Sequence, residues 1–570
     1  MKNSNLIGKV KTFFCSRYSN LLFSVLWIMS CAFLVFYVVR NGLIGYETND
    51  DLYMEIITSG AFGKSSPFTV YTNIVIGYIL VFLHKIAPMH NWFSILQIGG
   101  ITLAFIVFGV FLIYKKGNIK GYFLAVSILL CSFDTLICKM NFSKTGVFLF
   151  VTGFVMFISF LDSEDWKCRK NRVFRMGAFL LMLEGGLMRK QTFIACIPFV
   201  VVLILYMYRK YRKEFFERII PIVLSAVLLL FCWGIHEIAY RGNSEWKEFK
   251  EYDAAIIELL DYSLPEYDQN INFYRELGFS ENDYAILKEW KNGDKDYFNV
   301  ETLGKIVELS HELKKNTFNS ERVDAVNFCL VLFSKEYMVV LLLLVFAFAV
   351  LYAGSDYIYY ILSVLFLCYG ELWALLMKGR LNERSLYIPV LAAFVMISYF
   401  GVLSETSVKK NLEVSLLLLA VSCFAYYGCG IYSVLNLKEG KSYNKESASA
   451  IFEYTSSHQD SLYVMDIVDH SGMRMTAYGP FDEVASMPHS NIATLGGWLV
   501  PTPVWGNMIE PFGEKYNVIK SLALNENVYM ILPKDKDCLS VYYYIYEHYN
   551  TNVQVDVVEE IGEYFIYDFH

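Results

Sequence analysis

Long apolar runs with few charges dominate the chain from residue 20 to residue 435. Eleven of these runs are candidate transmembrane helices, since about 20 apolar residues are needed to cross the hydrocarbon core of a bilayer. They are 20–39, 92–114, 120–138, 143–161, 176–188, 191–208, 218–239, 335–353, 357–377, 386–403 and 412–435. The pattern therefore predicts a polytopic α-helical membrane protein with about eleven transmembrane helices.

A further apolar run, 70–86, is barely long enough to span and carries His84 and Lys85. Loop charges favour one placement for it, because short loops rich in Lys and Arg face the cytoplasm. The basic loops are 115–120, 162–175 and 209–218. All three are cytoplasmic only if 70–86 does not cross. We therefore expect 70–86 to be an outer juxtamembrane or re-entrant helix, with the N-terminus cytoplasmic and the C-terminal region outside the cell membrane.

Two polar segments interrupt or follow the apolar runs. Residues 241–333 are polar and rich in aromatic side chains, and they predict an extracytoplasmic helical insertion. Residues 441–570 combine a helical pattern with strand-like runs such as Ser461–Val468, which predicts an extracytoplasmic α/β domain. The first 440 residues form the predicted transmembrane domain, and its outer catalytic loop covers 41–91.

The amino-acid composition limits which classes of protein and partner are possible. Hydrophobic residues make up 55% of the chain and charged residues 18%, as expected for a chain that lies in lipid. The net charge of -7 argues against nucleic acid as a partner, because phosphate neutralisation needs a basic face. The twelve cysteines show no metal-binding spacing.

An acidic stretch, Glu47-Thr48-Asn49-Asp50-Asp51, follows the first apolar run directly. A carboxylate at Asp50 or Asp51 can deprotonate an acceptor hydroxyl, and the pair can hold a divalent cation such as Mg²⁺ or Mn²⁺ against phosphate oxygens. The alternative is a solvated acidic turn that caps the next helix. Ionisable residues this close to a membrane are often functional, so the catalytic and the capping interpretations both stay open at this point.

Basic residues recur at predicted outer helix ends, where the charge rule for loops does not expect them. They are Arg189, Lys190, Arg380 and Arg384. A lipid-linked phosphate explains such a cluster, because Arg binds phosphate through a two-pronged fork and Lys as a point charge. The alternative is that each side chain reaches out to lipid headgroups. Four more residues are candidates to line the same cavity: Glu47, Glu55, Lys144 and Glu371.

This combination resembles the GT-C superfamily of membrane glycosyltransferases. The resemblance rests on the first outer loop with E-T-N-D-D, the basic outer helix ends, about eleven spans and the C-terminal outer domain. Through the patterns Y-R-E-L-G-F-S-E-N-D-Y-A-I-L-K-E-W and N-I-A-T-L-G-G-W-L, the sequence also looks like multispanning proteins of bacterial surface-polysaccharide loci. It implies a polyprenyl-phosphate-linked sugar as donor, a glycan or glycolipid as acceptor, and catalysis by Asp50 or Asp51. It also implies phosphate binding by Arg189, Lys190, Arg380 and Arg384.

Two other functions fit the same features. A polysaccharide polymerase or ligase that joins lipid-linked repeat units would share the basic residues and depend less on the carboxylates. A lipid-linked glycan transporter or flippase would place its ionisable groups near the middle of the membrane and often shows internal repeats, which this sequence lacks. The leading hypothesis is an inverting glycosyltransferase of the bacterial cell membrane.

Overall fold

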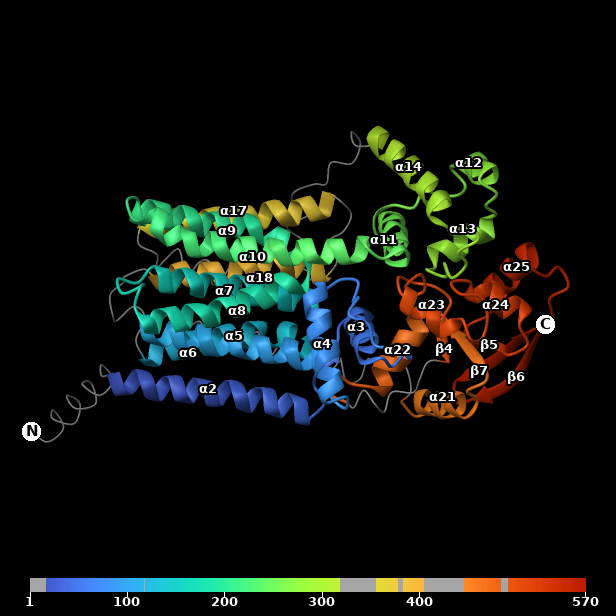
Figure 1. Ribbon diagram of the computed structural model, residues 1–570, viewed down its shortest axis with the longest axis horizontal. Coiled ribbons are helices and arrows are strands. Elements are labelled where there is room, and N and C mark those ends of the chain that lie inside the picture. The colour runs from blue at the N-terminus through green and yellow to red at the C-terminus, as the bar shows by residue number, and fades with distance from the viewer. Residues whose placement is uncertain (1–16, 117, 318–354, 378–382, 404–444, 483–490) are drawn as a thin grey trace, which may run out of the picture.

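The computed structural model describes residues 17–116, 118–317, 355–377, 383–403, 445–482 and 491–570. Long helices lie side by side in a bundle, and a polar region of short helices and one sheet lies at one end of it (Figure 1). The described N-terminal helix begins at the opposite end of the bundle (Figure 1).

Within the described residues, seven helices are long and apolar enough to cross a membrane. They are α2 (Arg17–Arg40), α5 (Trp92–Lys116), α7 (Phe142–Leu161), α9 (Lys190–Tyr211), α10 (Phe215–Arg241), α17 (Ser355–Met377) and α18 (Glu383–Leu403). This arrangement is compatible with a helical membrane protein, although it does not reproduce the eleven predicted spans.

The difference between seven and eleven has two sources. The predicted spans 335–353 and 412–435 lie outside the described residues. The predicted spans 120–138 and 176–188 belong to two helices of another kind. The first is α6 (Asn118–Phe133), which is short and continues into a π-helical turn, η1 (Asp134–Cys138). The second is α8 (Arg169–Met188), whose first two turns carry four basic side chains.

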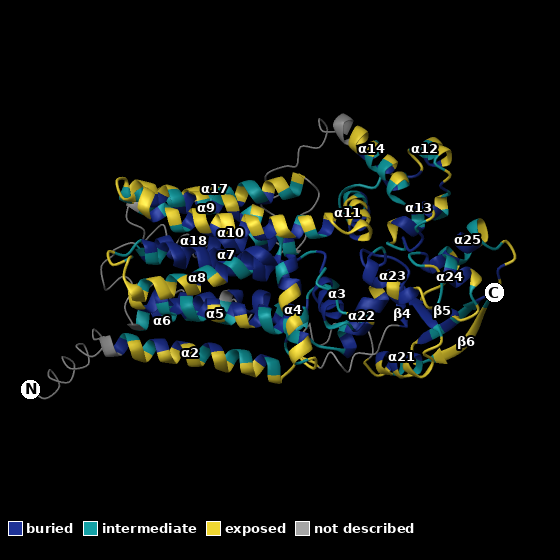
Figure 2. Cartoon of the chain, viewed as in Figure 1, coloured by how far each residue is buried: buried dark blue, intermediate teal, exposed yellow. Residues whose placement is uncertain are grey.

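Burial separates the central helices of the bundle from the peripheral ones. In α7 and α18, 89% of the most apolar window is buried, whereas in α2 and α17 only 22% is (Figure 2). A helix that is apolar on every side is stable only where other helices or lipid surround it. Glycines let α8 approach α7 closely, since a Cβ on Gly185 would lie 2.3 Å from the backbone nitrogen of Phe150.

Two short helices and a small sheet lie at the end of the bundle that faces the polar region. α4 (Ile74–Ile86) lies across the long helices rather than along them (Figure 1). Its 13 residues span only about 20 Å, and Tyr78, Phe82 and Ile86 are exposed on its outer face. The strands β1 (Gly45–Tyr46) and β2 (Lys139–Met140) pair in parallel and hold the start of α3 (Asn49–Ser59) against the bundle.

The polar region consists of a helical insertion and a C-terminal sheet region. The insertion contains α11 (Ser244–Ile256), the π-helical turn η2 (Ile257–Tyr262), α12 (Ile271–Glu276), α13 (Glu281–Lys288) and α14 (Val300–Thr317). The helices of the sheet region are α21 (Lys445–Ser457), α22 (Ile467–Ala477), α23 (Pro503–Ile509), α24 (Val518–Leu524) and α25 (Leu539–His548).

The sheet has five strands in the order β4-β3-β5-β7-β6. They are β3 (Leu462–Met465), β4 (Ile492–Thr494), β5 (Val528–Pro533), β6 (Val555–Ile561) and β7 (Tyr564–Phe569). The neighbours β4, β3 and β5 are parallel, and β7 and β6 are antiparallel. The segments that follow β3 and β4 therefore leave the sheet at the same edge, the edge at which open α/β sheets bind ligands.

Candidate functional site

A pocket of about 280 Å³ lies where the bundle, the insertion and the sheet region meet. We call it the junction pocket. Its bundle side is lined by Thr48, Asn49, Asp50, Tyr71, Arg189 and Arg384. Its polar side is lined by Ile257, Asp261, Trp290, Val468, Gly497 and Trp498, among others. Three residues that the sequence marks for chemistry, Asp50, Arg189 and Arg384, therefore share one cavity.

Asp50 lies in the first turn of α3, and both of its carboxylate oxygens have partners. Oδ2 accepts a hydrogen bond from Arg384 Nη1 at 2.7 Å, and Oδ1 accepts one from Trp498 Nε1 at 3.1 Å. The Asp50 side chain is one-tenth exposed and that of Arg384 about a quarter. An ion pair at the mouth of a small pocket keeps much of its strength because little water screens it.

Arg189 joins α8 to α9 in an extended conformation, so its side chain leaves the bundle at its polar end. Its Nη1 donates to Ser143 Oγ at 2.6 Å. The guanidinium also lies over the rings of Phe142 and Tyr71, at 5.1 and 5.8 Å from their centroids. These contacts orient the fork of Arg189, and a planar fork is the geometry that binds phosphate oxygens.

Tyr71 is held in the pocket by a strained backbone. The preceding residue, Val70, has φ of 70°, which is unusual for a β-branched side chain. Tyr240 Oη accepts from the Val70 N–H, and Lys250 Nζ donates to the Val70 carbonyl. Outliers of this kind persist where surrounding contacts impose them, and they cluster at functional sites.

Asp51 points away from the pocket although it is adjacent to Asp50. Its Oδ1 accepts from Gln97 Nε2 and from the Phe142 N–H, both at 2.9 Å, so it ties α3 to α5 and to the start of α7. Burial raises the pKa of the Asp51 carboxyl to about 8. Successive helical residues point about 100° apart, which is why only one member of the pair reaches the cavity.

The remaining predicted residues lie elsewhere, and Glu47, Lys144, Glu55 and Lys190 each form an ion pair. Glu47 pairs with the buried Lys144 at 3.0 Å, and neither residue lines the pocket. Glu55 pairs with His84 at 3.0 Å, and it accepts the first N–H groups of α5, a helix-capping role. Lys190 pairs with Glu237 at the surface.

Two more predicted residues do not contribute to the described pocket. Glu371 is half-buried on α17 and does not line the cavity. Arg380 lies outside the described residues.

Four side chains of the pocket were not predicted as site residues from the sequence: Tyr71, Asp261, Trp290 and Trp498. Trp498 could have been recognised from its position in G-G-W, a few residues after the strand β4. Asp261 lies in L-D-Y-S-L-P, a segment that the sequence marks only as aromatic-rich. Its π-helical turn is a rare conformation that often occurs at functional sites, and it is visible only in three dimensions.

A buried network connects α3 to the sheet region beside the pocket. Arg474 Nε donates to His470 Nε2 at 3.0 Å, so the other ring nitrogen carries the proton and donates to Tyr53 Oη at 2.6 Å. Burial and the Arg474 charge hold the pKa of His470 well below its usual range. Because Tyr53 lies one turn after Asp50 on α3, the sheet region helps to fix the position of that carboxylate.

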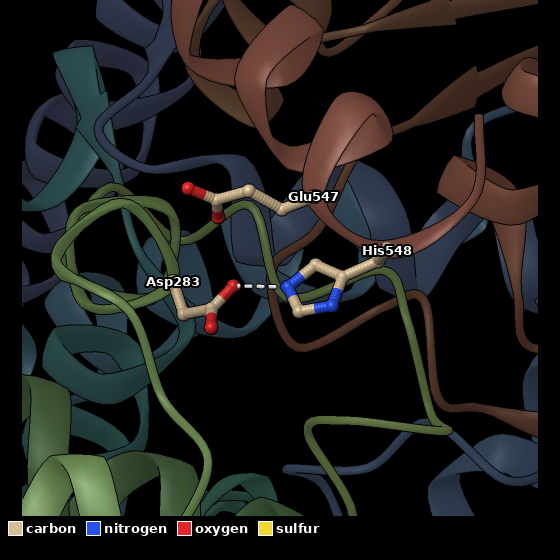
Figure 3. A group of neighbouring side chains, drawn as sticks. All are labelled: Asp283, Glu547 and His548. Atoms are coloured by element: carbon tan, nitrogen blue, oxygen red, sulfur yellow. Dashed lines mark hydrogen bonds and ion pairs between the residues drawn. The ribbon is translucent and has the colours of Figure 1, made fainter. Parts of the chain in front are cut away.

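The carboxylates of the first loop do not fit a divalent metal site. Nitrogen donors occupy both oxygens of Asp50 and one oxygen of Asp51, whereas Mg²⁺ and Mn²⁺ prefer oxygen ligands that face a common point. Among the described residues, the one group with metal-like spacing is Asp283, Glu547 and His548 (Figure 3), and none of the three lines the pocket.

That group is explained by docking of the insertion on the sheet region. His548 Nε2 lies 2.6 Å from Asp283 Oδ1, and Ser280 Oγ donates to Glu547 Oε2 at 2.8 Å (Figure 3). The other oxygen of Asp283 accepts the Ser280 N–H in a helix capping box. The three side chains thus connect α13 to α25, and we assign them no metal.

In comparisons with protein-family models, with curated proteins and with solved structures, nothing matches this chain. The function must therefore be inferred from the geometry of the junction pocket.

Proposed function

We propose that the protein is a membrane glycosyltransferase that moves a sugar from a polyprenyl-phosphate-linked donor to a cell-surface glycan or lipid-linked acceptor on the outer face of the membrane. The observation that carries the proposal is the convergence of Asp50, Arg384 and Arg189 in one pocket at the end of an apolar helix bundle. A lipid-linked substrate extends its tail along such a bundle and its head group into such a pocket.

The two arginines supply the donor phosphate site. Their guanidinium groups reach the cavity from α18 and from the α8–α9 connection. Positive charge fixed in advance stabilises a leaving phosphate without reorganisation during the reaction. A phosphate that approaches Arg384 competes with Asp50 for the same guanidinium, so donor binding frees the Asp50 Oδ2 atom.

The freed carboxylate then acts as the general base. Asp50 takes the proton of the acceptor hydroxyl, and the acceptor oxygen forms a bond to the anomeric carbon of the donor sugar. The bond between that carbon and the phosphate oxygen breaks, and the electron pair leaves with the polyprenyl phosphate. Attack from the face opposite to the phosphate inverts the anomeric configuration.

The position of the pocket favours transfer over transport. Asp50, Arg189 and Arg384 occupy the starts or ends of helices at one end of the bundle, whereas transporters bind their substrate near the midplane. The proposal gives Asp51 a supporting role and requires no metal ion.

The test is transfer by the purified full-length protein in nanodiscs from polyprenyl-phosphate donors that carry radiolabelled sugars, with and without EDTA. Labelled product or released polyprenyl phosphate that is insensitive to EDTA supports the proposal. Movement of the intact donor between leaflets, with no cleavage of its sugar–phosphate bond, would identify a flippase instead. Joining of multi-sugar lipid-linked units would identify a polymerase or ligase.

A further inference from the structure

The polar side of the junction pocket differs in chemistry from the bundle side. It presents two tryptophan side chains and one carboxylate, Trp290, Trp498 and Asp261, and none of its lining residues is cationic. Flat aromatic rings pack against the apolar faces of sugar rings, and nearby carboxylates accept hydrogen bonds from sugar hydroxyls. We call these three residues the aromatic wall.

The two tryptophans of the aromatic wall, Trp290 and Trp498, lie on two loops that are far apart in sequence. A Cβ on Gly496 would lie 1.9 Å from the Trp290 carbonyl oxygen, so only glycine permits this contact. Gly497, with φ of 90°, donates its N–H to Asn292 Oδ1 at 2.8 Å, and Asn292 Nδ2 in turn donates to Tyr252 Oη. The two loops therefore hold each other in place and present Trp290 and Trp498 together.

The backbone of Trp290 carries independent evidence of function. Its φ of 60° lies in the left-handed region, where a bulky side chain is rarely found. Glycine would adopt this conformation at no steric cost. Strained backbone of this kind clusters at functional sites, and Trp290 lines the pocket.

Pocket size limits what the wall can hold. A cavity of about 280 Å³ is at the lower end of the range for small-molecule sites, roughly 300–1,000 Å³. That space suits one sugar ring beside a phosphate group and is too small for an oligosaccharide. Asp261 comes from η2, and the bundle residues Arg189 and Arg384 line the same pocket.

We infer that the aromatic wall is a monosaccharide-binding site, in which a single pyranose ring packs on Trp290 and Trp498 and donates a hydroxyl hydrogen bond to Asp261. This inference deepens the proposed function and rests on it, since it assigns the sugar to one side of the pocket and the phosphate to the other. The chemistry of the wall fits a neutral pyranose, because a negatively charged sugar would meet the Asp261 carboxylate.

Two probes separate the two sides of the pocket. The first is a panel of methyl pyranosides of glucose, galactose, mannose, rhamnose and N-acetylglucosamine, detected by saturation-transfer NMR. The second is sugar-free undecaprenyl phosphate, detected by thermal shift. The full-length protein is used in phospholipid nanodiscs, since maltoside detergents would themselves compete for a sugar site.

The variants are Trp290→Gly and Asp261→Asn, with Glu258→Gln as the matched control. Glu258 lies on the same π-helical turn, where it faces His311 at 3.3 Å. Trp290→Gly removes the ring and relieves the backbone strain, so its melting temperature should not fall. Asp261→Asn keeps the side-chain shape and tests the wall a second time if the first variant does fold poorly.

The inference predicts that at least one methyl pyranoside binds the wild type and Glu258→Gln. Its saturation-transfer signal should fall about tenfold or more in Trp290→Gly and Asp261→Asn, as expected when the stacking ring or the hydroxyl partner is lost. Undecaprenyl phosphate should still bind both variants. Pyranoside signals that persist unchanged in both variants overturn the inference. If undecaprenyl phosphate binds but no pyranoside does, the inference is also overturned, while the phosphate site remains supported. If neither probe binds, the proposed function itself is refuted.

Discussion

The two sides of the junction pocket are built in different ways. On the bundle side, Asp50, Arg189 and Arg384 begin or connect helices whose bodies are fixed by apolar packing. On the polar side, Trp290 and Trp498 lie on loops that hold each other through glycine contacts and a hydrogen bond. The helices therefore fix the positions of the charged groups on the bundle side. The loops determine the shape of the pocket on the polar side, and loops tolerate sequence change more easily than packed helices do. A donor phosphate common to many substrates suits the first side, and a particular sugar suits the second.

The largest effect is expected from the bundle side, at Asp50. Asp50→Asn keeps the side-chain volume and removes the base, so transfer should fall by about 10²- to 10⁴-fold. The measurement is the initial rate with radiolabelled donor, with the melting temperature as the check on folding. Activity within a few fold of wild type in a folded variant would exclude Asp50 as the base.

A second large effect is expected at Arg384. Arg384→Gln removes the charge that faces both Asp50 and the proposed phosphate, and transfer should fall by about 10²- to 10³-fold. Arg384→Lys keeps the charge and loses the fork, so it should recover part of the loss. Binding of undecaprenyl phosphate should weaken in parallel. If Arg384→Gln binds undecaprenyl phosphate as tightly as wild type, this arginine does not hold the phosphate.

An intermediate effect is expected where the two sides touch, at Trp498. Trp498→Phe keeps an aromatic ring and removes the N–H that bonds Asp50 Oδ1. Loss of one hydrogen bond to a carboxylate should lower transfer by about tenfold. An unchanged rate in a folded variant would show that this hydrogen bond to Asp50 does not contribute to transfer.

A smaller effect, on stability rather than on activity, is expected at Asp51. The raised pKa means that the folded protein keeps the Asp51 proton between about pH 4 and pH 8, whereas the unfolded chain releases it. The stability that this group contributes is full below about pH 4 and is lost as the pH rises toward 8. Asp51→Asn mimics the protonated acid, so it should melt at a similar temperature to wild type at about pH 5 and at a higher temperature at about pH 8. Parallel melting curves across that range would mean that Asp51 is already ionised in the folded protein.

The smallest effect is expected at Lys190, which the sequence groups with Arg189. Its exposed pair with Glu237 should be worth at most about 1 kcal/mol. Lys190→Ala should leave transfer within about twofold of wild type, because Lys190 pairs with Glu237 at the surface and does not line the pocket. It therefore serves as the matched control for Arg189→Ala, measured in the same transfer assay. Equal losses in the two variants would place Lys190 in the phosphate site after all.

Local sequence patterns were enough to predict the elements that carry the bundle side. Apolar runs of the right length predict α2, α5, α7, α9, α10, α17 and α18, because burial in lipid or in a helix bundle demands them. The same runs overstate the number of spans, because α6 ends at Phe133 in a π-helical turn and the apolar part of α8 continues directly from two basic turns. The positions of Asp50, Arg189 and Arg384 at helix ends follow from the boundaries of these runs.

Only the tertiary structure decided which of those residues meet. Asp50 and Asp51 are equivalent in sequence, and the rotation of α3 against α5 and α7 sends one carboxylate to the pocket and buries the other. Trp290 and Trp498 are two among many aromatic residues until the contact between their loops brings them to one wall. The position of a long apolar run depends on neighbouring residues, so the sequence by itself determines it. The direction of a side chain, and the contacts between residues hundreds of positions apart in the sequence, depend on how the whole chain packs. They can therefore be read only from the tertiary structure.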